Sequence, residues 1–154
     1  MPGNPVARFL RLAAIDRKVF LRSLWMLAVA RLATWILPFQ RARHLLAPAS
    51  TRRPHPGLTP ERIHWAIGVA RRLVPAATCL PQALAAEALL AMGGHPAELQ
   101  IGVRKTEADG FEAHAWVESS GRIVVGHLPG GLGRYTRLPR LPDAWPDRRA
   151  ELPR

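Results

Sequence analysis

The chain has 154 residues and is strongly basic, and both properties limit what it can be. Its length fits one domain able to bury a sizeable core, and its 48% hydrophobic and 21% charged residues are typical of a folded protein. A single cysteine excludes an internal disulfide and a cysteine-rich zinc site. The net charge of +11 has two interpretations: a solvated surface rich in arginine through codon bias, or attraction to an acidic peptide, an anionic membrane surface or nucleic acid. Residues 1–53 carry most of this charge, with ten Lys and Arg against Asp16 alone.

Residues 7–46 predict an amphipathic helical arm that Pro38 ends or kinks. No cleavable secretory pattern is evident in its first residues. Arg22 and Arg31 interrupt the most apolar segment, whose longest uncharged run is too short to span a bilayer. We therefore expect a cytoplasmic protein whose arm packs on the domain or on a partner. Contact of the arm with a membrane surface, where basic helices with Trp also lie, is the less favoured alternative.

Two helices are predicted after a Pro-rich connector at residues 47–57. The first begins at Pro60, with Thr59 as N-cap, and runs to Val74. The second has Thr78 as N-cap, begins at Cys79 and runs to Met92, where two glycines end it.

Beyond Pro96 the hydrophobic period changes from 3.6 to 2, which predicts three strands in "AELQIGVRK", "EAHAWVE" and "RIVVGHL". Helices followed by an antiparallel meander define an α+β fold. The predicted organisation is a basic helical arm and connector over residues 1–57, a core over residues 58–142 and an irregular tail over residues 143–154.

Cys79 has two interpretations, a packed core thiol or a nucleophile. A helix N-terminus presents unpaired N–H groups and the positive end of the helix dipole, which favour a thiolate and can hold an oxyanion. A cysteine nucleophile needs a base, and His114 is the candidate because it lies within a predicted strand of the same domain. The pair would have the arrangement of papain-like chemistry.

The segments "TCLPQALAAEALLAMGGHPAELQIGVRK" and "FEAHAWVESSGRIV" resemble the transglutaminase-like leader peptidases of lasso-peptide biosynthesis. The resemblance is strong over residues 60–127 and extends to "LPFQRARHLL" in the arm. It implies a transglutaminase-like, papain-like cysteine protease core in which Cys79 is the nucleophile and His114 the general base and then the general acid. It also implies a precursor peptide as substrate, no cofactor or metal, a separate leader-recognition protein as partner and the lasso cyclase as a further candidate partner.

The family's third catalytic residue is typically an aspartate on the strand after the histidine, and this chain departs from that pattern. Its window reads "VVGHL", without a carboxylate. A two-residue loop at Ser120–Gly121 would pair residue 119 with 122 and place His127 opposite His114 on the same face. His127 is then either the residue that orients His114 or an unrelated surface histidine.

The missing aspartate keeps a second hypothesis open, a catalytically weak or silent scaffold or binding subunit of the same maturation complex. Nucleic-acid binding is a third hypothesis, but no helix-turn-helix, zinc or RNA-binding signature supports it, and we expect no nucleic-acid partner.

Overall fold

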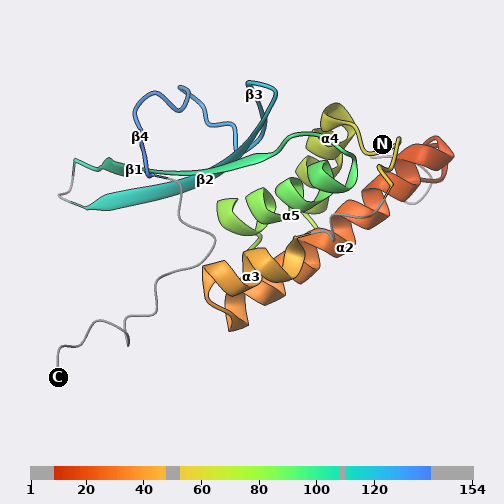
Figure 1. Cartoon of the computed structure of the whole chain (residues 1–154), viewed down its shortest axis with the longest axis horizontal. Helices are drawn as coiled ribbons and strands as arrows, with labels where there is room; N and C mark the ends of the chain where they lie inside the picture. The colour runs from red at the N-terminus through yellow and green to blue at the C-terminus, as the bar shows by residue number, and fades with distance from the viewer. Residues whose placement is uncertain (1–8, 48–52, 108–109, 140–154) are drawn as a thin grey trace, which may run out of the picture.

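The computed structural model describes residues 9–47, 53–107 and 110–139, and these form two layers (Figure 1). The helices lie on one face of an antiparallel sheet, and the segment that joins the last two strands crosses the other face. The protein is therefore α+β, as the order of helical and strand patterns predicts.

Helices α2 (Ala14–Ile36) and α3 (Phe39–Leu46) form the arm. They are separated at Leu37, which is extended, and Pro38 is the N-cap of α3. The sequence prediction that Pro38 ends or kinks the arm is confirmed, because proline cannot continue the hydrogen bonding of the preceding helix.

Helices α4 (Pro60–Ala70) and α5 (Cys79–Met92) begin where the caps predict. The Thr59 side chain accepts a hydrogen bond from the Arg62 N–H at 3.4 Å. α4 ends four residues before the predicted Val74, and the chain continues in turns in which Arg72 and Leu73 donate to carbonyls three residues back. Leu73 is 61% exposed, so the apolar stripe that favoured a longer helix is not buried at its end.

Strands β1 (Glu98–Lys105), β2 (Phe111–Ser119) and β3 (Arg122–Val125) form the predicted meander. A fourth strand, β4 (Thr136–Arg137), pairs with β1 and gives the sheet order β3-β2-β1-β4. The sequence analysis missed β4, because two residues in a Gly- and Arg-rich segment carry no alternation to recognise.

The β2–β3 hairpin confirms the predicted loop but not the register beyond it. Ser119 pairs with Arg122 and Glu118 with Ile123, yet Val117 pairs with Val125, so β3 contains a one-residue bulge. A bulge turns the following side chains to the opposite face of the sheet. The prediction that His127 lies opposite His114 on the same face is therefore wrong.

One hydrophobic core joins the arm to the rest of the described chain. The inner face of α2 is buried, and it packs with α4, α5 and the helix-side residues of the sheet; the cluster includes Phe20, Leu27, Ala30, Ile63, Ile67, Leu84, Leu89, Ala115 and Val117. The arm thus packs on the domain, as the sequence predicts. The proposed tail at residues 143–154 lies outside the described residues.

Within the described residues, α2 is the one helix whose length and composition would suffice to cross a membrane. About a third (33%) of its most apolar window is buried against the protein, so the inner face of α2 is already used in the core.

Candidate functional site

Cys79 is the first residue of α5, is half-buried and packs against the edge of the helical core. A tight turn delivers the chain to this position: Ala76 has a positive φ of 53°, and the Thr78 N–H donates to the Ala76 carbonyl at 2.9 Å. The Gln82 side chain then donates to the Ala77 carbonyl at 2.6 Å and ties this turn to the first turn of the helix. The thiol is held at a defined place by local backbone structure.

The helix start at Cys79 keeps backbone donors available. The Thr78 side chain makes no capping hydrogen bond, unlike that of Thr59 at the start of α4. The first N–H groups of a helix have no partner inside the helix, so those of Cys79 and Leu80 are free of intrahelical bonds, and Pro81 has no N–H. This arrangement can stabilise a negative charge on sulfur or on a substrate oxygen.

His114 lies in β2 and is half-buried among aromatic rings. Its Nε2 is 2.8 Å from the Gly126 carbonyl oxygen, which can only accept, so Nε2 carries the proton and Nδ1 is the basic nitrogen of the neutral ring. The ring stacks on Trp116 with centroids 6.3 Å apart, and the Tyr135 ring lies 5.8 Å away. Among the described residues, a backbone carbonyl and two aromatic rings thus fix the orientation of His114, and no carboxylate is hydrogen-bonded to it.

The two predicted catalytic residues have separate surroundings. Ala115 and Val117 of β2 point into the core shared with α5, whereas His114 and Trp116 alternate with them and contact the segment that crosses the other face of the sheet. In the part of the chain that the structure describes, no hydrogen bond joins Cys79 to His114. The catalytic roles of Cys79 and His114 stay predictions from the sequence.

His127 belongs to a different cluster. Its ring makes an edge contact with His64 of α4 at 5.4 Å between centroids, and the two line a cavity of about 510 Å³ together with Glu61 and Arg122. The His64 Nδ1 donates to the Val124 carbonyl at 2.6 Å, next to the bulge. The bulge thus turns His127 toward α4 and away from the predicted position opposite His114.

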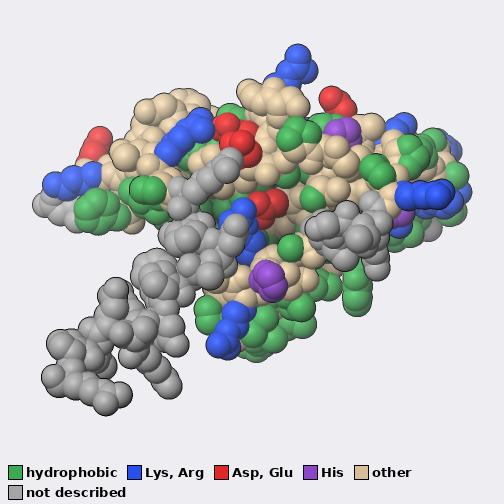
Figure 2. All heavy atoms as spheres, in the orientation of Figure 1, with side chains coloured by type: hydrophobic (Ala, Val, Ile, Leu, Met, Phe, Trp, Pro, Cys, Tyr) green, Lys and Arg blue, Asp and Glu red, His purple; other side chains and the backbone are tan. Residues whose placement is uncertain are grey.

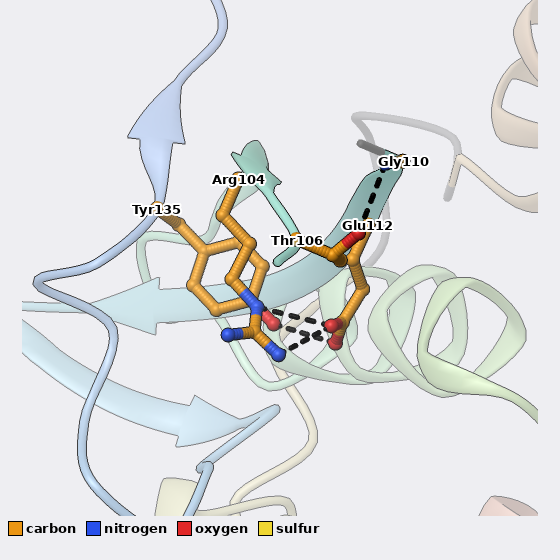
Figure 3. Close-up of polar contacts among 5 residues, drawn as sticks. All are labelled: Arg104, Thr106, Gly110, Glu112 and Tyr135. Carbon is orange, nitrogen blue, oxygen red and sulfur yellow. Dashed lines mark hydrogen bonds and ion pairs between the residues drawn. The ribbon is translucent and has the colours of Figure 1, made fainter. Parts of the chain in front are cut away.

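A polar network that the sequence analysis missed lies beside His114 (Figure 3). Glu112, two residues before His114 on β2, accepts hydrogen bonds from the Tyr135 hydroxyl at 2.7 Å and from the Arg104 Nε at 3.0 Å. The Tyr135 hydrogen bond and then the Arg104 guanidinium lower the pKa of the Glu112 carboxyl below its ordinary value of 4.5. The alternation of β2 could have placed Glu112 on the face of His114, but nothing in the sequence pointed to Tyr135 as its partner.

The same face also carries a charged pair above Trp116. The Trp116 indole N–H donates to Glu118 at 2.9 Å, and Arg137 of β4 donates to the same carboxylate at 2.8 Å. Trp116 is fully buried, and its ring fills the space over Gly102, where a Cβ would lie 2.9 Å from it. These contacts fix the wall of the site around His114.

Within the described residues, no group of three or more His, Cys, Asp or Glu side chains could hold a metal ion. The reactive groups of the candidate site are the thiol of Cys79, the N–H groups around it and the ring of His114.

A comparison with protein families matches residues 23–140 to the transglutaminase-like superfamily. The match includes Cys79, His114 and most of α2, and this superfamily includes cysteine proteases. No curated protein and no solved structure matches the chain. Since the match covers more than half of the chain and agrees with the α+β arrangement, the protein belongs to the transglutaminase-like superfamily.

Proposed function

We propose that this protein is a cysteine endopeptidase that removes the leader peptide from a lasso-peptide precursor. The observation that carries the proposal is the position of Cys79, the one cysteine of the chain, at the uncapped start of α5 in a transglutaminase-like domain. The resemblance of the Cys79 and His114 segments to lasso leader peptidases supports the choice of substrate.

In the proposed reaction, the Cys79 thiolate attacks the carbonyl carbon at the leader–core junction. The N–H groups at the start of α5 stabilise the oxyanion that forms. Protonated His114 gives its proton to the departing amine of the core peptide, and the leader remains bound as a thioester. Water, deprotonated by His114, then hydrolyses the thioester and releases the leader acid and the free thiol.

This sequence of steps requires the His114 ring within hydrogen-bond distance of the Cys79 sulfur. In the free chain the Nε2–H of the ring is bonded to the Gly126 carbonyl, which leaves Nδ1 for the thiol. The active form can therefore keep this bond, but it requires Nδ1 and the Cys79 sulfur to approach each other, which binding of the substrate or of a leader-recognition protein would bring about. We accordingly propose a separate leader-recognition protein, with the lasso cyclase as a further candidate partner.

A scaffold or binding subunit of the same maturation complex is the second candidate function. It is favoured by one specific observation, that the His114 ring is hydrogen-bonded to the Gly126 carbonyl and, among the described residues, to neither Cys79 nor a carboxylate. Such a subunit would keep the fold and bind the precursor without cleaving it.

Alkylation of Cys79 by iodoacetamide at pH 7 separates the two functions, because the attacking species is the thiolate. For a peptidase we expect a rate above that of free cysteine, because Cys79 lies at the start of α5, and, with the recognition protein present, a loss of about tenfold or more in His114→Ala. His127→Ala is the matched control and should leave the rate unchanged, since His127 contacts His64. The same variants are then tested for cleavage of a precursor peptide with and without the recognition protein. An ordinary alkylation rate together with full processing by Cys79→Ala would contradict the peptidase and support the scaffold.

A further inference from the structure

The outer face of α2 carries a continuous apolar stripe that no part of the described chain covers. The stripe consists of Leu21, Trp25, Ala28, Leu32 and Trp35, which alternate at spacings of four and three and so share one side of the helix. The two indoles are 70% and 73% exposed, and both leucines are more than half exposed. In Figure 2, hydrophobic side chains gather along the lower edge of the molecule, over α2 and α3.

An exposed apolar stripe of this kind indicates a surface that binds a partner. Single exposed apolar residues are common in soluble proteins, but a contiguous set with two tryptophans is not. The opposite side of α2 already packs in the core through Leu27, Ala30 and Ala33, so the stripe is not the side by which α2 packs on the domain. The described part of the chain thus leaves the stripe free for a binding partner.

The charges next to the stripe are cationic. Lys18 and Arg22 are exposed on the first turns of α2, and Arg31 borders the stripe near its middle. Asp16 is the one acidic residue in α2, and its carboxylate accepts from the Arg62 Nε at 2.9 Å. A partner that binds the stripe is thus expected to have an apolar region bordered by negative charges.

We propose that the outer face of α2 binds the surface of an anionic lipid bilayer. A helix with Trp and Leu on one face and Lys and Arg at its margins lies in the plane of the interface, with its apolar face below the headgroups. Indole rings favour this depth because they are apolar with one polar N–H. α2 lies on the bilayer and does not cross it, because its inner face is held in the protein core.

The proposal differs from the favoured expectation of the sequence analysis, that the arm makes no membrane contact. That expectation relied on Arg22 and Arg31, which interrupt a spanning segment. Basic residues beside an apolar stripe do not oppose binding at the surface, where they contact anionic headgroups. The exposure of Trp25 and Trp35 could not be known from the sequence, since it depends on which side of α2 packs on the domain.

Co-sedimentation of the full chain with vesicles tests the proposal. We expect binding to vesicles of phosphatidylcholine with phosphatidylglycerol, weaker binding to phosphatidylcholine alone, and loss of the difference at high salt. Trp25→Ser with Trp35→Ser should lower the partition coefficient roughly tenfold or more. Lys18→Gln and Arg22→Gln should each lower it about fivefold at low salt. Phe111→Ser is the matched control, because Phe111 is 79% exposed on β2 and should not contribute.

Circular dichroism establishes that each variant is folded, which the exposure of the substituted side chains leads us to expect. Quenching of tryptophan fluorescence by lipids brominated in the acyl chain gives an independent measure of insertion, and it should disappear in the double tryptophan variant. Absence of vesicle binding at low salt would overturn the proposal. So would self-association in lipid-free buffer that the tryptophan substitutions abolish, because a second copy of the chain would then cover the stripe.

Discussion

Replacement of Gly126 by alanine would place a methyl group against β2, beside the carbonyl that holds the His114 ring. Gly126 has a φ of +97° and directly follows β3. A Cβ there would lie 2.5 Å from the Cβ of Trp116 and 2.8 Å from the Ala115 carbonyl oxygen. Both neighbours belong to the centre of β2, so neither can move without shifting the strand that carries His114.

Two terms set the size of the effect. A left-handed conformation costs a non-glycine residue about 1–2 kcal/mol. Forcing a methyl group into a closely packed region costs about 1–3 kcal/mol more. The sum, about 2–5 kcal/mol, is a large part of the roughly 5–15 kcal/mol by which a domain is stable. We therefore expect Gly126→Ala to be strongly destabilised, with the Gly126 carbonyl displaced from the His114 ring.

Two other glycines provide matched controls. Gly121 has a φ of +76°, and a Cβ at this position would have no neighbouring atom within 4 Å, so Gly121→Ala should show the conformational cost alone. Gly68 lies inside α4 with nothing within 4 Å, so Gly68→Ala should raise the free energy of unfolding by about 0.5–1 kcal/mol.

The free energies of unfolding and melting temperatures of the three Gly→Ala variants are measured by urea and thermal unfolding, followed by circular dichroism. At about 2–4 °C per kcal/mol for a chain of this size, Gly126→Ala should melt about 2–12 °C below Gly121→Ala. Equal stability of these two variants would refute the packing argument, because they differ chiefly in what surrounds the new methyl group.

Two further predictions concern the polar contacts. Because the pKa of Glu112 is lowered in the folded state by Tyr135 and Arg104, its carboxylate should stabilise the protein above about pH 4.5 and lose this effect as the pH falls through the lowered value. The urea midpoints of wild type and Glu112→Gln should differ at pH 7, and the difference should shrink as the pH falls below about 4.5; a difference that does not change with pH would exclude this mechanism. Thr59→Ala should lower the free energy of unfolding by about 1 kcal/mol, whereas Thr78→Ala, which removes no capping bond, should change it by less than about 0.5 kcal/mol in the same urea titration; equal losses would contradict the assignment of the caps.

The sequence by itself determined the elements whose signals are local. Thr59–Pro60 and Thr78 mark the starts of α4 and α5, Gly93 marks the end of α5, and Pro38 separates α2 from α3. The change of period after Pro96 identifies the meander, and the helix-start position of Cys79 follows from the cap alone. Hydrogen bonds and steric limits within a few residues decide these features, so they can be recognised without the fold.

Only the tertiary structure decided which side chains meet. The bulge after Val117 turns His127 toward His64, although the hairpin loop itself is as predicted. The partner of Glu112 is Tyr135, which lies in a segment without any regular pattern. Which side of α2 packs on the domain, and hence the exposure of Trp25 and Trp35, also depends on the whole fold. These contacts join residues far apart in the chain, and a shift of one residue in a strand reverses the face of every side chain that follows, so no local signal could fix them.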